Sequence, residues 1–375
     1  MSTRPSFQVE YIEPATIDAE PLPEEFSASR LRRSLLFLAA VAIVVAAVIV
    51  LIPGLASLRD RFSGGRPGWL LVAALLELAS CLSYVVVFRG VFCREMSWRT
   101  SAEIGFSELG ANSVFSVGGA GGLALGAWIL RRGGVPAPYI ARRTVAFFLL
   151  TSLANVSFLL LGGLALGSGV FHGSRSHAMG LIPAAAGAAA IMLALAARKV
   201  AAVLAHRLQQ PRLMHAAEAV GEGVDEALRL LRTGDPAIFL GAAGYLLFDV
   251  AMLGVCFKAF GNDVPPVGVL LVAYLIGQLG SLIPIPGGIG GVDGGLIGGL
   301  VLYGVPAADA AVAVIAYRGL LLTIPALLGV PALGVLRRRL RDEQHDIAAC
   351  APGGTVEVLG RGTVQRGEPV AETSR

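Results

Sequence analysis

The sequence predicts an all-α fold, a polytopic transmembrane helical bundle with about eight spans, and three observations support this prediction. Hydrophobic residues make up 55% of the 375 residues, charged residues 15%, and the mean hydropathy is +0.71. Soluble domains carry roughly 25% charged residues, so a chain this apolar needs a bilayer. The chain also contains apolar runs long enough to cross about 30 Å of hydrocarbon. Finally, GGAGG at 118–122 recurs as GGIGG at 287–291.

The elements follow one another between two polar tails. Residues 1–29 are acidic and show no helical or strand period, which predicts a disordered cytoplasmic tail, and residues 342–375 predict another. The region 30–341 between them is the expected transmembrane domain. Its apolar runs are, in order, Ser34–Leu58, Pro67–Phe88, Ile104–Leu130, Thr144–Ser168, Ala178–Ala197, Ala237–Phe257, Val264–Ala308 and Ala310–Leu336.

Six of these runs predict single spans, and two carry the glycine breaks. The first run has no charge from Ser34 to Leu58. It is too long for the apolar part of a signal peptide and is expected to be an uncleaved first helix. Ile104–Leu130 and Val264–Ala308 contain the two GGxGG copies, so each predicts either a re-entrant pair or two short helices.

Basic residues predict the orientation of the spans, because Lys and Arg favour the cytoplasmic side. Arginines precede the first run, follow the second, follow the first glycine break and end the last run. Both termini and the loop 198–235 are therefore expected in the cytoplasm of a multi-pass plasma (inner) membrane protein. One loop disagrees, since Arg59, Arg61 and Arg66 fall on the predicted outer side.

This orientation brings the two glycine breaks in from opposite sides of the bilayer. Such an arrangement is an inverted repeat, the architecture typical of alternating access. The cytoplasmic loop itself alternates apolar and charged residues at helical spacing over 198–232. It predicts a helical hairpin lying on the inner surface, or else a plain solvated connector.

The second break carries the clearest candidate site. Pro284 and Pro286 end a helix, and the glycines Gly287, Gly288, Gly290 and Gly291 allow a new one to begin. The amides at a new helix N-terminus can bind an anion such as a phosphate headgroup. The alternative is tight packing through the stripe Gly290, Gly294 and Gly298. The matching glycines of the first break are Gly118, Gly119, Gly121 and Gly122.

Charged residues within the spans are the other candidates, because a charge in a membrane is costly and usually faces a cavity or a partner. Arg318, preceded by Tyr317, offers a planar fork suited to phosphate. It could instead pair with Asp293 or Asp249, or reach the nearer interface. Asp293 could pair with Arg318, bind a coupling ion or carry a proton. Weaker candidates are Glu77, Glu108 and Asp249.

Other classes of function find no support in the sequence. Motifs of metalloproteases, serine hydrolases and nucleotide-binding enzymes are missing, so we expect no enzyme and no cofactor. No basic face with interleaved aromatics predicts nucleic-acid binding. The cysteines Cys81, Cys93, Cys256 and Cys350 form no CxxC pair, so neither a disulfide framework nor a zinc site is expected.

A family resemblance rests on the two glycine segments. The run from Pro286 to Gly329, with Tyr317-Arg318 and Pro325, resembles the lysylphosphatidylglycerol synthase/flippase transmembrane-region family of flippase-like membrane proteins. The segment 118–143 is similar to that family's other glycine segment, and the resemblance covers about 34–340. It implies lipid translocation. With only residues 342–375 after Arg341, the cytosolic transferase domain of the bifunctional members, and hence lysyl transfer, is not expected.

Two departures from the family pattern stand in the first half. The family's first glycine segment usually continues with Glu, where this chain has Leu123. Its next helix usually carries a Glu-Arg pair and an Asp, where this chain has Phe147, Phe148 and Thr151.

These observations lead to a functional expectation with two alternatives. We expect a transporter of an anionic phospholipid or polyprenyl-phosphate-linked lipid, with membrane lipids as partners through an anionic headgroup. The alternatives are a non-transporting scaffold or accessory subunit of a cell-envelope glycosyltransferase complex, and an ion-coupled solute transporter. A homo-oligomer or a partner of envelope biosynthesis remains open.

Overall fold

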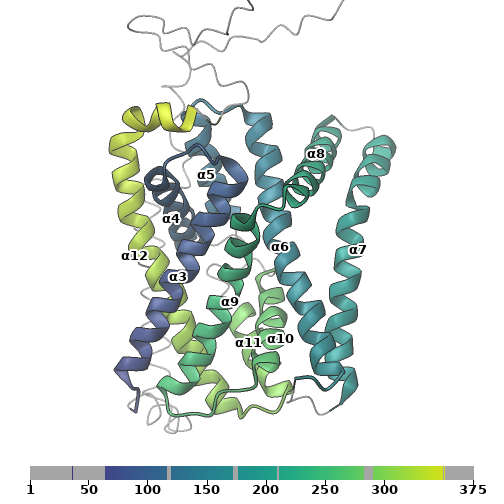
Figure 1. Cartoon of the computed structure of the whole chain (residues 1–375), viewed down its shortest axis with the longest axis vertical. Helices are drawn as coiled ribbons and strands as arrows, with labels where there is room; N and C mark the ends of the chain where they lie inside the picture. Colours follow the sequence, from purple (N-terminus) through teal and green to yellow (C-terminus); the bar gives the residue numbers. More distant parts are fainter. Residues whose placement is uncertain are drawn as a thin grey trace, which may run out of the picture.

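The computed structural model describes residues 36, 64–115, 120–171, 176–208, 211–282, 290–348 and 350. Every regular element within this part is helical, which confirms the all-α membrane bundle (Figure 1). Its helices are α3 (Pro67–Phe92), α4 (Trp98–Phe115), α5 (Ala120–Arg132), α6 (Ala137–Gly167), α7 (His177–Leu208), α8 (Pro211–Thr233), α9 (Pro236–Ala259), α10 (Val267–Gln278), the short 3₁₀ helix η4 (Leu279–Leu282), α11 (Gly291–Leu302) and α12 (Ala307–Ala348).

Several expected features lie outside the described residues. These are the tail 1–29, the first span Ser34–Leu58 apart from Leu36, the glycines Gly118, Gly119, Gly287 and Gly288, and residues 351–375.

Five described helices are long and apolar enough to cross a membrane: α3, α6, α9, the first part of α7 (His177–Ala196) and most of α12 (Ala307–Leu336). Proline begins two of them, Pro67 in α3 and Pro236 in α9, where its missing N–H costs nothing. Asp235 caps α9, because its side chain accepts a hydrogen bond from the Ala237 N–H at 3.0 Å.

Each of the two glycine-broken runs forms a pair of short helices. α4 and α5 come from the first run, and α10 and α11 from the second. In Figure 1 the pair α4–α5 lies in the upper half of the bundle, and α10–α11 lies in the lower half. The members of each pair pack against each other.

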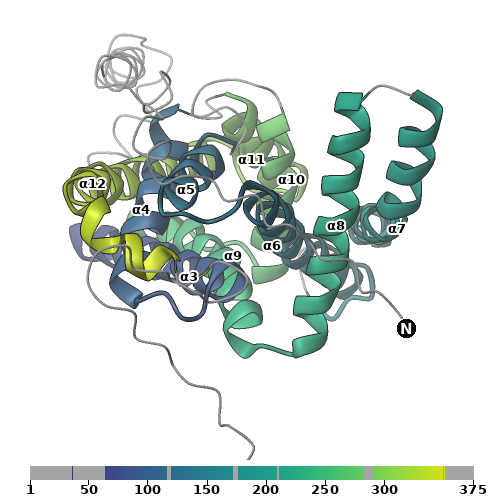
Figure 2. The ribbon, with the colours of Figure 1, turned by 90° about the horizontal axis from the view of Figure 1, so that it is seen from above.

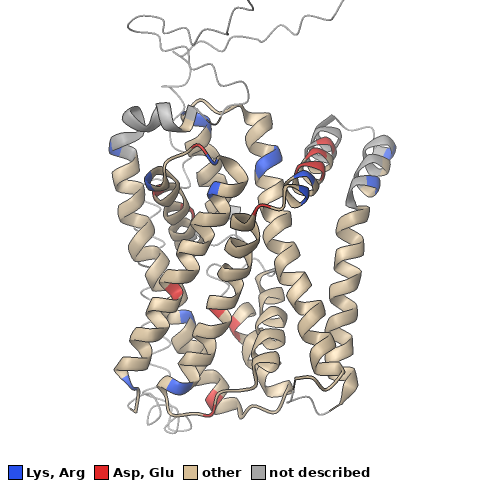
Figure 3. Cartoon of the chain, in the orientation of Figure 1, with Lys and Arg blue, Asp and Glu red and all other residues tan. Residues whose placement is uncertain are grey.

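The basic residues gather at the upper end of the bundle, where α3 finishes and α4 begins (Figure 3). We call this the basic end. The opposite end includes Arg66, which precedes α3, and Lys258, whose Nζ lies 5.2 Å from the centre of the Trp69 ring.

The expected hairpin over 198–232 is present as the end of α7 and the whole of α8 (Figure 2). α8 is held to α6 by Glu226, which is 4% exposed and lies 3.1 Å from the Nε atom of Arg143 and 3.9 Å from that of Arg142. Gly223 of α8 also fits closely over Val145 of α6. The hairpin is therefore a packed part of the molecule as well as a connector.

Two sequence expectations are wrong at the basic end. α12 continues to Ala348, so residues 342–348 are helical where the sequence predicted a disordered tail. Cys93 and Cys350 form a disulfide across 257 positions of sequence, although their spacing suggested none. Neither feature leaves a local sequence pattern, because both depend on α12 returning to the end of α3.

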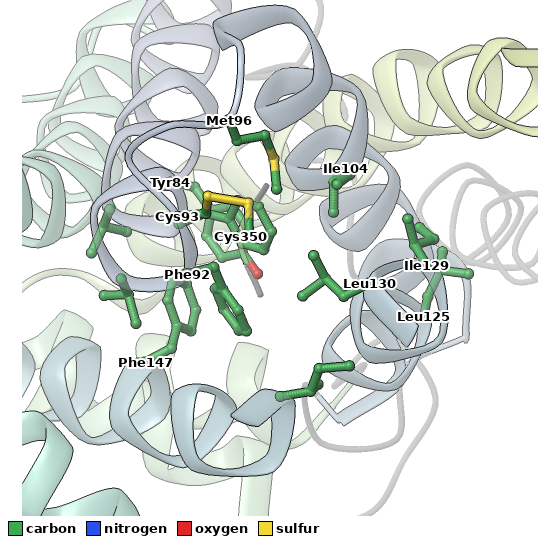
Figure 4. Close-up of a cluster of buried hydrophobic side chains, with 14 of the residues drawn as sticks. Tyr84, Phe92, Cys93, Met96, Ile104, Leu125, Ile129, Leu130, Phe147 and Cys350 are labelled. Atoms are coloured by element: carbon green, nitrogen blue, oxygen red, sulfur yellow. A yellow bond between two sulfur atoms is a disulfide. The ribbon is translucent and has the colours of Figure 1, made fainter. Parts of the chain in front are cut away.

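The disulfide lies beside one of two buried apolar clusters (Figure 4). In this cluster the Phe92 ring stacks on Phe88 at 4.7 Å and lies 5.9 Å from Phe147. The second cluster joins α9, α10, α11 and α12 and includes Tyr274 and Tyr317. A central cavity is lined by residues from both clusters.

Candidate functional site

A cavity of about 470 Å³ lies in the middle of the bundle, between the two broken pairs. Every helix from α3 to α12 except α7 and α8 contributes to its wall. Most of the lining is polar or aromatic, in contrast to the apolar helices around it. The polar lining residues are Glu77, Tyr84, Asn112, Ser113, Thr151, Ser152, Asn155, Tyr245, Asp249, Tyr274, Gln278, Ser281 and Arg318.

The cavity opens to the outside of the described bundle. Its lining includes Phe148, which is 58% exposed, and the exposed Ser281 of η4. A chamber of this size that reaches the surface and has polar side chains in its wall can hold a small headgroup while apolar chains remain outside it.

Arg318 lines this cavity, as its position within the last span suggested. Its side chain is only 11% exposed, and Nε lies 2.7 Å from Oδ1 of Asp293. The structure thus contains the ion pair that the sequence left as one alternative. The pair and a role in binding substrate are compatible, because the same side chain also faces the cavity.

Asp293 links this arginine to the start of α11. Its Oδ2 accepts a hydrogen bond from the Gly290 N–H at 2.9 Å, which caps the helix. Gly290 has φ +89°, a left-handed conformation that favours glycine. The second glycine break therefore positions Asp293, and Asp293 positions Arg318.

Tyr317 occupies a different place from its neighbour. It is fully buried in the second apolar cluster and does not line the cavity. Its ring lies edge-on to Tyr274, with 6.3 Å between centroids. Tyr317 supports the wall formed by Tyr274 and does not contact the cavity contents.

The glycines of α11 pack, but not through the stripe that the sequence suggested. Added Cβ atoms at Gly294 and Gly298 would meet no described atom within 4 Å. At Gly291 a Cβ would lie 2.5 Å from the Gly280 carbonyl oxygen, and at Gly295 it would lie 3.1 Å from Gly277 Cα. The close contact is therefore made by Gly291, Gly295 and Gly299, one residue further along.

The two helices of the first broken pair also approach each other closely at glycines. Gly122 of α5 donates its N–H to Asn112 Oδ1 at 2.7 Å, and a Cβ there would lie 2.4 Å from the Glu108 carbonyl oxygen. One turn later, a Cβ at Gly126 would overlap the Glu108 carboxylate. Gly121, beside them, is half-buried. In both pairs, glycines four residues apart on the second helix let the first helix approach.

The sequence ranked Glu77 and Asp249 as weak candidates, yet the structure brings them to the same cavity wall. Glu77 is 2% exposed on α3, and Asp249 is 3% exposed on α9. The two carboxyls are close enough to interact electrostatically. Asp249 accepts a hydrogen bond from Tyr274 at 2.8 Å, while Glu77 Oε2 has no partner among the described residues.

Glu108 does not line the cavity itself but contacts a residue that does. It is 1% exposed on α4, and its Oε2 accepts a hydrogen bond from the Tyr84 hydroxyl at 2.7 Å. Tyr84, in turn, lines the cavity and makes edge contacts with Phe147 at 5.3 Å and Tyr245 at 5.5 Å.

The positions at which the family resemblance leads one to expect charges also line the cavity. Leu123, Phe147, Phe148 and Thr151 all contribute to its wall. Apart from Glu77, the first half of the chain therefore presents uncharged residues here. The charged groups of the described lining come from α3, α9 and α12 alone.

In the part of the chain described here, no three His, Cys, Asp or Glu side chains gather as a metal site would require. The buried titratable groups of the cavity are instead arranged in pairs, as described above.

Comparison with known proteins identifies the family. The model of the lysylphosphatidylglycerol synthase transmembrane region matches residues 37–329, which include both glycine breaks and all of the cavity lining. No curated protein and no solved structure gives a significant match. The family match and the five apolar helices make this an integral membrane protein. The chain belongs to the family of the lysylphosphatidylglycerol synthase transmembrane region, whose description points to lipid handling.

Proposed function

We propose that this protein moves an anionic phospholipid or a polyprenyl-phosphate-linked lipid between the two leaflets of the membrane. The observation that carries the proposal is Arg318, the single cation among the described residues lining a polar cavity inside an apolar bundle. The headgroup would enter the cavity, and its phosphate would contact the guanidinium. The lipid chains would stay outside, in the bilayer.

The packing of the helices supports a repeated architecture with alternating access. Each half contains a long helix, a broken pair and a second long helix: α3, α4–α5 and α6, then α9, α10–α11 and α12. When each helix is matched with its counterpart in the other half, the contacts between helices match as well. α3 packs on α9, and the contact of α4 with α12 corresponds to that of α10 with α6. Together with the opposite placement of the broken pairs in Figure 1, this supports an inverted repeat around the cavity.

The two buried carboxyls limit the headgroup that would fit. Glu77 and Asp249 share the cavity with Arg318, so its wall offers carboxyl oxygens as well as one cation. Carboxylates accept hydrogen bonds from hydroxyl or ammonium groups. A phosphate that carries a sugar or another hydroxyl-rich group would therefore match both sides of the cavity.

The Glu77–Asp249 pair also favours a second candidate, a proton-coupled transporter of a solute. Two carboxyls in one buried site tend to share a proton, as in other coupled pairs. In that case cargo movement would depend on a pH gradient, and lipid movement would not be detected.

A translocation assay tests the main proposal. Purified protein is placed in vesicles that contain a headgroup-labelled anionic lipid, and the label in the outer leaflet is destroyed chemically. Wild type should expose the inner-leaflet lipid, and Arg318→Ala should abolish this while remaining folded and inserted. Arg99→Ala is the control, since Arg99 is exposed and paired with Glu103 far from the cavity. Normal turnover in Arg318→Ala would remove this arginine from the mechanism.

A further inference from the structure

A second hollow lies on the side of the bundle, between α5 and α6. It has a volume of about 530 Å³ and is lined mainly by apolar side chains, among them Ala127, Trp128 and Ile140. Three of its alanines, Ala124, Ala137 and Ala141, are exposed, so the hollow is an open groove on the described surface. Its volume and apolar wall suit a hydrocarbon chain.

The groove becomes polar toward the basic end. Arg131, exposed at the end of α5, lines it. The next residue, Arg132, has its guanidinium carbon 5.4 Å from the centre of the Trp128 ring. Trp128 is only 8% exposed, and its indole Nε1 has no hydrogen-bond partner among the described residues. The groups gathered here are donors and cations, which select an anion.

Other arginines of this end are already engaged. Arg142 and Arg143 pair with Glu226 of α8, and Arg99 pairs with Glu103. No carboxylate of the described chain pairs with Arg131 or Arg132. Their charge is therefore available to an external anion at the level of the lipid headgroups.

The groove and the central cavity share one lining residue. Leu123 of α5 lines both hollows. A headgroup that passed Leu123 would leave Arg131 and Arg132 and enter the central cavity. There it would meet the polar side chains of the cavity wall.

We infer that the α5–α6 groove binds an anionic phospholipid from the leaflet at the basic end, and that Leu123 is the gate through which its headgroup reaches the central cavity. The acyl chain lies along the alanine-rich wall, and the phosphate is held by Arg131, with Arg132 beside it. The gate rests on the proposed function, whereas lipid binding in the groove does not require transport.

Trp128 provides a direct probe of the groove. The chain has three tryptophans, and Trp69→Phe with Trp98→Phe leaves Trp128 alone. In vesicles, brominated phosphatidylglycerol should quench its fluorescence at about fivefold lower mole fraction than brominated phosphatidylcholine, since one arginine near a membrane surface contributes about this factor. Equal quenching by the two lipids would overturn the inference.

Arg131→Gln should remove the preference for the anionic lipid, and Arg99→Gln should keep it. Arg99 is a matched control because it lies at the same end but already has a partner. If the tryptophan substitutions prevent folding, the same comparison is made by native mass spectrometry of anionic lipid retained on the otherwise unaltered chain. Equal retention by wild type and Arg131→Gln would also overturn the site.

A bulkier gate separates binding from movement. Leu123→Trp should reduce translocation at least tenfold and should reduce lipid retention, measured by native mass spectrometry, much less. Retention without translocation in wild type would disprove the proposed function but leave the groove as a lipid site. Translocation in Leu123→Trp at the wild-type rate would disprove the gate.

Discussion

At the scale of single residues, the buried carboxyls are held by tyrosines that belong to the cavity wall. Tyr84 donates to Glu108, and Tyr274 donates to Asp249. A hydrogen bond to a charged buried group contributes about 1.5–3 kcal/mol. Removing one partner, so that the other is left buried without a hydrogen bond, destabilises the fold more than removing both partners. These contacts therefore fix the shape of the wall as well as the carboxyls.

Tyr84→Phe should lower the free energy of unfolding by about 1–3 kcal/mol, because the buried Glu108 carboxyl would lose the hydroxyl that donates to it. Glu108→Leu together with Tyr84→Phe should recover part of this loss, since neither partner is then left alone. Thermal unfolding in detergent measures both. Equal losses for the single and double variants would show that the hydrogen bond does not stabilise the fold.

The sequence predicted part of this site. Arg318 and Asp293 stood out because each is an isolated charge in an apolar run. Glu77 and Asp249 gave the same signal, but their importance depends on α3 packing against α9. That contact joins segments far apart in the chain, so no spacing rule reveals it. Tyr317 lies outside the cavity lining, because adjacency to Arg318 says nothing about which way a helical side chain faces.

At the scale of elements, close helix packing within each broken pair depends on glycine. On α11 the contact residues are Gly291, Gly295 and Gly299, and on α5 they are Gly122 and Gly126. The sequence predicted that these segments would break and pack. It did not fix the packing face, because the run of glycines offers four-residue stripes on several faces.

Two alanine substitutions one turn apart on α11 test this packing. Gly291→Ala should destabilise the protein by about 1–3 kcal/mol, because the new methyl group would meet the backbone of Gly280. Gly294→Ala should be neutral, or stabilising by up to about 1 kcal/mol, through better helix propensity. Melting temperatures of the two variants provide the comparison. The reverse order would mean that the other face of α11 makes the contact.

At the scale of the whole molecule, the two ends differ in charge. The basic end includes the hairpin of α7 and α8, and the opposite end includes the connection from α6 to α7 (Figures 1 and 3). The charge bias predicts that the basic end faces the cytoplasm. Arg66 is the arginine of the described chain that lies at the opposite end and so disagrees with this bias. Its backbone N–H donates a hydrogen bond to the Ala259 carbonyl at 2.8 Å.

Labelling of single cysteines in intact cells tests this orientation, with the native cysteines replaced. Ser168→Cys, after α6, should react with a membrane-impermeant maleimide from outside. Glu222→Cys, on the exposed side of α8, should react only after permeabilisation. The opposite pattern would show that the basic end faces outward. Labelling of both cysteines from outside would rule out a bundle that spans the membrane.

The sequence also predicted most of this architecture, since long apolar runs and basic clusters are local features. Within the described residues, five of the expected spans, the hairpin and the two broken pairs appear near their expected positions. The return of α12 to Cys93 was missed, because its last turns are polar and nothing in their composition distinguishes a docked helix from a tail.

A charge exchange between Arg318 and Asp293 tests the central claim, that this arginine serves the cargo in addition to the fold. Asp293→Arg with Arg318→Asp restores an ion pair across α11 and α12 but moves the guanidinium away from its place in the cavity wall. In the vesicle assay we expect a double variant that folds and inserts, although it loses the carboxylate cap on the Gly290 N–H, and that does not translocate the lipid. Translocation at the wild-type rate would contradict the account, because the pair would then have a structural role only.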